Sequence, residues 1–339
     1  MTKLRTEPID LYFQNYIDHA PLAPQQLHTQ ACENDGPTIN AWRPIWEKNV
    51  LENHNKYKSF ELNSIGSIYG EAHMQPVVIV GSGPSLKNNA HELKNRGDIK
   101  VVSCLHNFHF LEDLGCPADY YVSLDAGDIT TEEVYEGGAH DEHHYWNLTK
   151  DRTLLCYIGT SPRLLEKWRG KVLFFNAPVP DQQFTDYVDK IELFNTYVSS
   201  GGNVLGACLY IAKAYLGASI VGFIGADFCF GYNSKFHAWD SKYDKNMGQV
   251  MRLRDVFGMP VSTWKSYYNF KGWFEYISMT VPGIYYNCSE GGTLGAYNEG
   301  NLRSIIQHTL KDFLRQMTMY SEIKEQALNP KTNEKKLLF

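Results

Sequence analysis

The feature that most constrains the fold is a short apolar run that ends in a glycine-containing loop. Val77–Val80 consists of β-branched residues, and Gly81-Ser82-Gly83-Pro84-Ser85 follows it directly. Continuous apolar runs of this length are typical of buried parallel strands. Glycines let a backbone approach a ligand closely, and Pro84 suits the first turn of a helix. The segment therefore predicts a strand, a tight loop and a helix in succession.

The same alternation continues along the chain and predicts a sheet. Apolar runs that read as further strands are Lys100–Leu105, Tyr120–Leu124, Thr153–Ile158, Val172–Phe175, Ser219–Ile224 and Ile284–Asn287. Segments that read as helices are Leu86–Arg96, Phe108–Leu114, Pro162–Trp168, Asn203–Leu216, Tyr268–Met279 and Asn301–Met319. Alternating strands and helices predict an α/β protein with a Rossmann-like, doubly wound and mostly parallel sheet and helices on both faces.

The chain divides into three parts by its pattern. Residues 1–70 show no strand alternation; Ile9–Phe13 and Trp42–Tyr57 read as helices, and we expect the prolines at 21, 24 and 37 to break the stretch between them. We interpret this part as an N-terminal helical extension. Residues 71–320 form the Rossmann-like domain, and residues 321–339 read as a C-terminal tail that frays.

Composition excludes several classes of protein. The 339 residues carry a formal net charge of −6, which argues against nucleic acid as the partner. We expect no signal peptide, because Met1–Asn15 is polar and mixed in charge, and no apolar run approaches the ~20 residues that span a bilayer. Its seven cysteines form no CxxC pair and several lie in apolar runs, which indicates buried, reduced thiols in a cytoplasmic protein. The oligomeric state does not follow from the sequence.

The glycine loop is the first candidate binding element. If a helix begins after it, its free N–H groups and positive dipole end would attract a phosphate to residues Gly81, Ser82, Gly83, Pro84 and Ser85. It is not a Walker A loop, because no Gly-Lys-Ser/Thr follows, and Leu86 takes the third glycine position of the dinucleotide fingerprint. An ordinary tight turn is the alternative interpretation.

Three titratable residues are candidates for catalysis. Asp125 and Asp227 each follow a predicted strand, at the sheet edge where ligands bind in this fold class. A carboxylate there can bind Mg²⁺, hold a ribose hydroxyl or act as a base, and capping of the next helix is the alternative. His237 lies in the loop after Asp227 and is either a base or phosphate ligand, or a solvated loop residue.

Two further segments combine glycines with small or acidic residues. Ser200, Gly201, Gly202 and Asn203 open the alanine-rich helix and would cradle an anion, or would simply cap that helix. Glu290, Gly291 and Gly292 follow the strand Ile284–Asn287. Aromatic residues, 14% of the chain, are frequent between Tyr232 and Tyr286, where they would line a pocket or fill a core.

The loops that leave the carboxyl ends of the strands meet at one edge of such a sheet. We therefore expect the candidate residues to line one concave pocket large enough for a nucleotide, on the order of 300–1,000 Å³. If these residues lay on opposite faces of the sheet instead, the glycine loop would be an ordinary turn, and the chain would share only its fold with ligand-binding proteins of this class.

Five stretches, taken in order, resemble the 6-hydroxymethylpterin diphosphokinase MptE-like family, which includes the core of motility-associated-factor flagellin glycosyltransferases. They are Gly81–Leu86; Leu114–Asp119 with Ser123–Asp125; Gly201–Val204 with Gly225–Phe228 and His237-Ala238; Val261–Thr263; and Asn287–Gly292. The likeness covers roughly residues 40 to 315. The loop Gly83-Pro84-Ser85-Leu86 also looks like that of bacterial sialyltransferases.

The resemblance implies a transferase that uses a nucleotide donor. In the pterin enzymes, ATP gives a diphosphate to a pterin hydroxymethyl group, with Mg²⁺. In the flagellin enzymes, a CMP-activated nonulosonic acid gives its sugar to a Ser or Thr hydroxyl. The small size and single core of this chain favour a small molecule such as a pterin, or a glycan, as the acceptor. A nucleotide-binding module without catalysis is the third possibility. This chain lacks the large flanking domains of the flagellin enzymes, and Cys116 stands where isoleucine is commoner.

Overall fold

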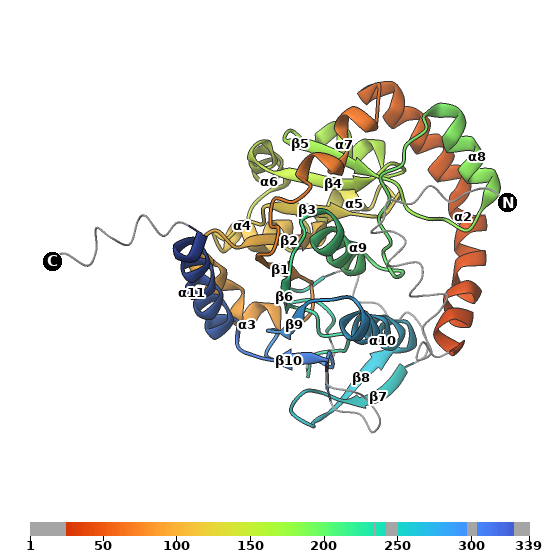
Figure 1. The fold of residues 1–339 in the computed structure, drawn as a ribbon. Coiled ribbons are helices and arrows are strands. Elements are labelled where there is room, and N and C mark those ends of the chain that lie inside the picture. The colour runs from red at the N-terminus through yellow and green to blue at the C-terminus, as the bar shows by residue number, and fades with distance from the viewer. Residues whose placement is uncertain (1–24, 233–234, 242–249, 297–303, 329–339) are drawn as a thin grey trace, which may run out of the picture.

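The structure is a computed structural model that describes residues 25–232, 235–241, 250–296 and 304–328, with side chains between 39 and 320. Within these residues one sheet has eight strands, in the order β10-β9-β6-β1-β2-β3-β4-β5 (Figure 1). The bounds are β1 Pro76–Val80, β2 Lys100–Cys104, β3 Tyr120–Ser123, β4 Thr153–Tyr157, β5 Lys171–Phe175, β6 Ile220–Ile224, β9 Ile284–Asn287 and β10 Ile305–Gln307. All neighbouring strands of this sheet are parallel, as predicted.

The strand order reverses between β1 and β6. The chain runs outward from β1 to β5, returns to place β6 on the other side of β1, and continues outward to β9 and β10. The N–H of Gly81 donates to the carbonyl of Ile224 at 2.8 Å, and the N–H of Gly83 donates to that of Gly225 at 2.8 Å. The loops after β1 and β6 therefore meet at the switch point, where proteins of this class bind ligands.

Helices cover both faces of the sheet (Figure 1). Gly222 of β6 packs under the Phe313 ring of α11 (Leu310–Leu328), whereas its neighbour Phe223 lies 5.6 Å from the Phe274 ring of α10 (Lys265–Thr280). Successive strand residues point to opposite faces, so α10 and α11 lie on opposite sides. The other helices are α3 Leu86–Asn89, α4 Phe108–Asp113, α5 Thr130–Glu133, α6 Glu142–Leu148, α7 Pro162–Lys167, α8 Gln182–Ile191 and α9 Val204–Tyr210.

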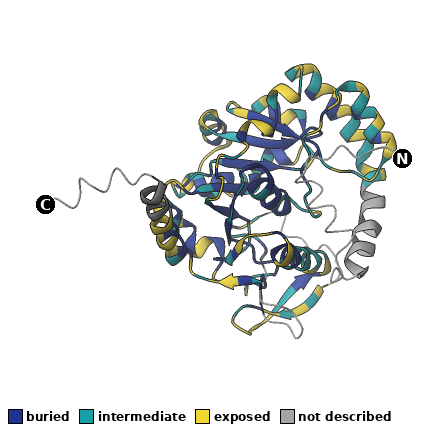
Figure 2. Cartoon of the chain, in the orientation of Figure 1, coloured by how far each residue is buried: buried dark blue, intermediate teal, exposed yellow. Residues whose placement is uncertain are grey.

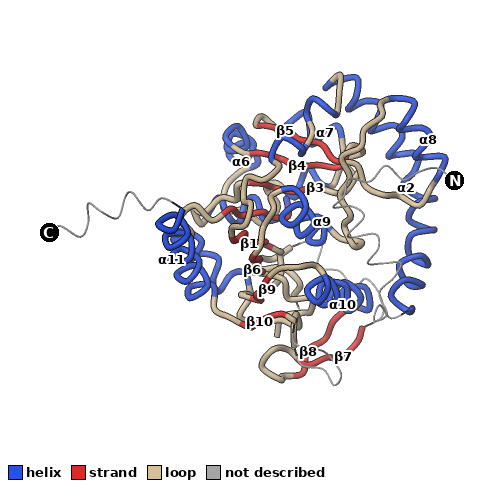
Figure 3. The backbone as a smooth tube through the Cα atoms, viewed as in Figure 1, coloured by secondary structure: helices blue, strands red, loops and turns tan. Residues whose placement is uncertain are grey.

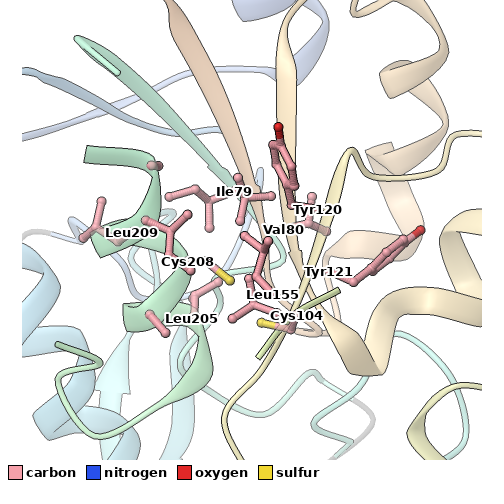
Figure 4. Packing of buried hydrophobic residues seen from close by; sticks show 14 of the residues in the cluster. Ile79, Val80, Cys104, Tyr120, Tyr121, Leu155, Leu205, Cys208 and Leu209 are labelled. Atoms are coloured by element: carbon pink, nitrogen blue, oxygen red, sulfur yellow. The ribbon is translucent and has the colours of Figure 1, made fainter. Parts of the chain in front are cut away.

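The core lies between the central strands and their helices, where burial is deepest (Figure 2). Leu205, Cys208 and Leu209 of α9 lie over Ile79 and Val80 of β1 (Figure 4). All five are buried. Burying one such aliphatic side chain stabilises the folded state by roughly 1.5–3 kcal/mol. The loops at the ends of these strands are therefore attached to a well-packed core. The six cysteines in the described side chains are buried as well.

The helix predicted at Trp42–Tyr57 is confirmed as the end of a longer helix, α2 (Gln25–Tyr57). The prediction that Pro37 breaks the chain there is wrong, because α2 runs through it. A proline costs a helix one hydrogen bond and about 3 kcal/mol, and the packing of α2 on the domain opposes this cost. The helix predicted at Ile9–Phe13, Cys32 and residues 329–339 lie outside the described residues or side chains.

Two predicted helices need correction, and three helices were missed. The helix predicted at Leu86–Arg96 is one α-turn, α3, followed by a 3₁₀ segment, because Asn89 leaves helical geometry and its amide donates to the carbonyl of Cys288 and to Glu290. The helix predicted from Asn301 begins only at Leu310, and strand β10 precedes it. Helices α5, α6 and α8 were not predicted.

A second, two-stranded sheet interrupts the aromatic stretch. Strands β7 (Val250–Arg254) and β8 (Pro260–Trp264) pair antiparallel in a hairpin at the edge of the molecule, apart from the main sheet (Figure 3). The N–H of Phe230 donates to the carbonyl of Ser262 at 2.8 Å, which ties the hairpin to the chain after β6. Helix α10 follows directly, three residues earlier than predicted. None of the described helices has the length and apolar character needed to cross a bilayer.

Candidate functional site

A cleft of about 210 Å³ lies at the carboxyl ends of β1, β2, β3 and β6. The structure brings seven of the candidate residues together on its wall: Gly81, Ser82, Gly83, Asp125, Asn203, Asp227 and His237. Those residues come from four separate loops, as the topology predicts. The cleft is smaller than the 300–1,000 Å³ expected, because the loops after β1 and β6 are bonded directly to each other.

The glycine loop is shaped by its neighbours in the protein. A Cβ atom on Gly83 would collide with the Asp227 carboxylate and lie 2.7 Å from the carbonyl oxygen of Gly225. A Cβ on Gly81 would lie 2.5 Å from the same oxygen. Both glycines are thus required for the close approach of two loops, which leaves the exposed backbone of Ser82 and Gly83 along the cleft.

Asp227 holds these loops together. Its Oδ2 accepts hydrogen bonds from the Ser85 hydroxyl at 2.8 Å and from the Ser85 N–H at 3.2 Å. Burial raises the pKa of this carboxyl to about 6, and the Ser85 hydrogen bonds act in the opposite direction. One oxygen of Asp227 is therefore already engaged within the protein, which favours a positioning role over metal binding.

Two carboxylates face the cleft from β3 and α5. Asp125 follows β3 and is exposed to the cleft, yet the surrounding protein displaces enough water to raise its pKa. Glu133, which the sequence analysis missed, also lines the cleft. Loss of solvent raises the pKa of Glu133 to about 7; His106 lowers it, and the charge of Asp125 raises it. The two carboxyl groups are therefore close enough to influence each other's ionisation.

Histidines form a third part of the site. His106 and His237 both line the cleft, and their ring centroids are 4.8 Å apart. Glu136 accepts hydrogen bonds from Trp239 Nε1 at 3.4 Å and from the Ser241 hydroxyl at 3.2 Å, and it lies 3.3 Å from His106 Nε2. The loop that carries His237 is thereby fastened to the region after β2 and α5.

Aromatic side chains close one side of the cleft. Phe236, Tyr267 and Phe270 line it, and the Phe236 ring stacks on Trp264 of β8 with centroids 3.5 Å apart. Flat apolar surfaces of this kind suit a base, a pterin or a sugar. The aromatic stretch thus supplies both the pocket wall and the core beneath it.

Of the four candidates at the start of α9, only Asn203 lines the cleft. Ser200 accepts a hydrogen bond from the N–H of Gly202, while Trp273 and Phe270 pack against Gly201 and Gly202. Asn203 lines the cleft but also caps α9 through the N–H of Gly206, at 2.9 Å. This cap is the alternative that the sequence left open.

The second glycine segment is likewise structural in its contacts. Glu290 accepts hydrogen bonds from the Asn89 amide and from the N–H of Leu310, which begins α11. Gly291 and Gly292 pack against Asp227, and Pro84 belongs to the turn before α3. None of these residues lines the cleft.

The acidic side chains of the cleft determine whether it can hold a metal ion. No group of three or more His, Cys, Asp or Glu side chains within the described part of the chain is arranged to hold a metal ion. Asp125 and Glu133 offer carboxylate oxygens, and Mg²⁺ is commonly held by one or two carboxylates together with substrate phosphates. One of these carboxylates would therefore suffice to hold a magnesium ion that arrives with a nucleotide.

His106 could have been found from the sequence, whereas Glu133 could not. His106 follows the predicted strand Lys100–Leu105 just as Asp125 follows Tyr120–Leu124. Glu133 lies eight residues after Asp125, within a short helix that no strong apolar periodicity announces. Glu136 carries no comparable signal, because its partners come from a loop 100 residues later in the chain.

The open parallel sheet, with a cleft at its switch point, defines a Rossmann-like α/β fold. The model of the family described as 6-hydroxymethylpterin diphosphokinase MptE-like matches residues 48–233, more than half of the chain. The chain therefore belongs to the MptE-like family, as the sequence motifs predicted. No curated protein sequence matches it significantly.

Among solved structures, the chain is similar to the MAf glycosyltransferase from Magnetospirillum magneticum AMB-1. The two share 17% sequence identity with a TM-score of 0.50. The match covers 78% of this chain and 41% of that chain, so the present chain spans less than half of its neighbour. At this identity the similarity shows a shared fold.

Proposed function

We propose that this protein transfers a group from a nucleotide donor to the hydroxyl of a small acceptor. The observation that carries the proposal is the open carboxylate of Asp125, which faces the cleft beside the glycine loop. The family description, a diphosphokinase, and the structural neighbour, a glycosyltransferase, both name transferases. The donor phosphate would lie along the backbone of Ser82 and Gly83.

Asp125 is the proposed general base. Its raised pKa brings it nearer to neutrality than an ordinary aspartate, which favours proton abstraction. The acceptor hydroxyl would lose its proton to Asp125 as its oxygen attacks the donor, and the nucleotide would leave. Neighbouring Glu133, with a pKa of about 7, is the candidate to take up or return a proton during turnover.

The first candidate reaction is diphosphate transfer from ATP to a pterin-like hydroxymethyl group. The acceptor oxygen would attack the β-phosphorus, and AMP would leave. The carboxylate of Glu133 favours this reaction because it could hold Mg²⁺, in place of its proton-transfer role, while Asp125 stays free to act as the base. The metal would supply positive charge that neutralises the donor phosphates. Phe236 or Tyr267 would then stack on the pterin ring.

The second candidate is glycosyl transfer from a CMP-activated sugar. Phe236, Tyr267 and Phe270 favour it, since their rings offer a platform for a sugar or cytosine. The same Asp125 would accept the proton of the glycan hydroxyl, and CMP would leave. His237 would donate a hydrogen bond to the departing phosphate.

Thermal unfolding with ATP, CTP, CMP and UDP-sugars, each with and without Mg²⁺, tests the proposal. A true donor at 100 times its dissociation constant stabilises a protein by about 2.7 kcal/mol. We then expect AMP from ATP with a hydroxymethylpterin, or CMP from a CMP-sugar with a glycan. Stabilisation by ATP that needs Mg²⁺ and is lost in Glu133→Gln favours diphosphate transfer.

Asp125→Asn is the decisive variant, and Asp128→Asn, in the same loop, is its matched control. We expect Asp125→Asn to reduce turnover by 10²-fold or more while leaving the fold intact, and Asp128→Asn to retain activity. Binding of a nucleotide without turnover, unaffected by Asp125→Asn, would identify a non-catalytic nucleotide-binding module. No response to any nucleotide would reject the proposal.

A further inference from the structure

The turn of the β7–β8 hairpin exposes apolar side chains. Phe257 is 67% exposed and Met259 53% exposed, and Tyr232, from the chain after β6, is 77% exposed beside them. Single exposed hydrophobic residues are ordinary, but a group gathered around one turn marks an interaction surface. We call Tyr232, Phe257 and Met259 the apolar tip.

Polar bonds, rather than apolar packing, fix the shape of this tip. Asp255 is buried, and its Oδ1 accepts hydrogen bonds from the N–H groups of Phe257 and Met259, at 2.9 and 2.8 Å. Its Oδ2 accepts from the Tyr232 hydroxyl at 2.6 Å. One carboxylate thus holds the turn and all three tip residues. The exposed side chains of Phe257 and Met259 are therefore not needed to form the turn.

Positive charge lies next to the apolar tip. Val250, Arg252 and Arg254 occupy the exposed side of β7, where alternate residues face the same way. The Arg254 guanidinium donates to the carbonyl of Gly258 at 2.7 Å, which draws it toward the turn. This local positive charge contrasts with a chain whose formal net charge is −6.

We propose that the apolar tip inserts into the surface of an anionic lipid membrane, with Arg252 and Arg254 on the lipid phosphates. Apolar side chains flanked by cations are the combination that binds the interface of such membranes. The charge complementarity distinguishes this partner from an apolar protein groove. The inference does not depend on the reaction proposed above.

The hairpin would also orient the cleft. Thr263 of β8 donates to the carbonyl of Phe228 at 2.6 Å, and Phe228 lines the cleft. Trp264, the next residue, stacks on the cleft residue Phe236. Docking of the tip would therefore place the cleft at a fixed position near the membrane.

Vesicle cosedimentation with the full chain tests this inference. We expect the protein to bind phosphatidylcholine vesicles that contain phosphatidylglycerol, and to bind pure phosphatidylcholine weakly. The double variants Phe257→Ser/Met259→Ser and Arg252→Gln/Arg254→Gln should each lower binding by about tenfold or more. Added salt should weaken the binding that the arginines provide.

Leu62→Ser is the matched control, since Leu62 is 87% exposed far from the hairpin and its loss should leave vesicle binding unchanged. Thermal unfolding establishes that each variant is folded. Two results would overturn insertion of the tip. The protein would not bind anionic vesicles, or Arg252→Gln/Arg254→Gln would lose vesicle binding while Phe257→Ser/Met259→Ser kept it. A fall in oligomeric mass of the Phe257→Ser/Met259→Ser variant on sedimentation, without a change in vesicle binding, would assign the tip to a protein interface instead.

Discussion

Gly83 lies where two loops, more than 140 residues apart in the chain, touch. The sequence indicates that its missing side chain makes room for a phosphate, whereas the space beside it is taken by Asp227 and the carbonyl of Gly225. The glycines of the loop therefore serve the joining of β1 and β6 first, and any ligand second. At the scale of the residue, a substitution at Gly83 should therefore lower the stability of the fold.

Gly83→Ala should lower the free energy of unfolding by about 1–3 kcal/mol, as overpacked positions do. Urea denaturation measures the effect. Gly291→Ala in the neighbouring loop is the control, because its Cβ would lie 3.4 Å from the nearest atom. Equal stability of the two variants would contradict the close packing at Gly83.

Asp227 makes the stability of the protein depend on pH. Its pKa rises from 3.8 to about 6 on burial, so the folded state binds more protons than the unfolded state between these values. Stability from this group is therefore present at low pH and is lost as the pH rises through 6. The loss corresponds to about 3 kcal/mol.

Asp227→Asn removes this titration while keeping an oxygen acceptor for Ser85. We expect the stability of the variant relative to the wild type to increase by up to about 3 kcal/mol between pH 4 and pH 8. Chemical denaturation across this range measures the free energy of unfolding of both proteins. The contributions of the other carboxylates are the same in both and cancel in the difference. A difference that does not vary with pH would show that Asp227 ionises normally.

At the scale of the element, the segment from Lys235 to Ser241 forms part of the cleft wall. The N–H of Ala238 donates to the carbonyl of Ser82 at 3.1 Å, so this segment bonds directly to the glycine loop. Glu136 fastens the same segment through Trp239 and Ser241. The position of His237 in the cleft thus depends on the Glu136 carboxylate, which lies in the turn after α5.

Glu136→Ala should loosen this segment. Hydrogen bonds to a charged group contribute about 1.5–3 kcal/mol, so amide exchange at Ala238 should quicken by about tenfold or more. The affinity for the nucleotide donor should fall as well, because this segment forms part of the cleft wall. Hydrogen exchange read by mass spectrometry is the measurement, and Glu142→Ala, which removes an exposed ion pair with Lys167, is the control. Unchanged amide exchange at Ala238 would show that Glu136 does not hold this segment in the cleft wall.

Elements with continuous apolar runs were predictable from the sequence, and the strands β1 to β6 and β9 are where the pattern put them. The hairpin was missed although β7 alternates between exposed and half-buried residues, because the aromatic density around it suggested a loop. Strand β10 has three residues and leaves almost no pattern. Helix α8 was missed despite Asp181, which caps it through the N–H groups of Gln183 and Phe184.

The candidate site, like the fold, was predictable from the sequence only in part. Asp125 and the glycine loop could be placed in one cleft because the topology brings strand ends together. The contacts of Glu290 with Asn89 and Leu310 could not be foreseen, since each partner comes from a distant element. Long-range packing thus decided which of the polar residues in the motifs face a ligand.

At the scale of the whole molecule, α2 is part of the domain that the sequence separated from it. Its Asn49 amide donates to the carbonyls of Ala126 and Gly159, both at 3.0 Å. The Asn53 amide donates to those of Ile158 and Thr160, both at 2.9 Å. These carbonyls follow β3 and β4, so the N-terminal helix satisfies polar groups at the same sheet edge as the cleft.

Asn49→Ala and Asn53→Ala should each lower the free energy of unfolding by about 1–3 kcal/mol, because each leaves two carbonyl oxygens without their amide donors. Asn55→Ala, on the exposed side of the same helix, should change it by less than about 0.5 kcal/mol. Because Ala126 directly follows Asp125, Asn49→Ala should in addition weaken donor binding, whereas Asn53→Ala should not. Calorimetric titration of the donor and urea denaturation of the same samples separate the two effects. Donor binding that is equal in the two variants would mean that α2 supports the fold alone, and an unfolding curve with two transitions would make α2 an independent extension.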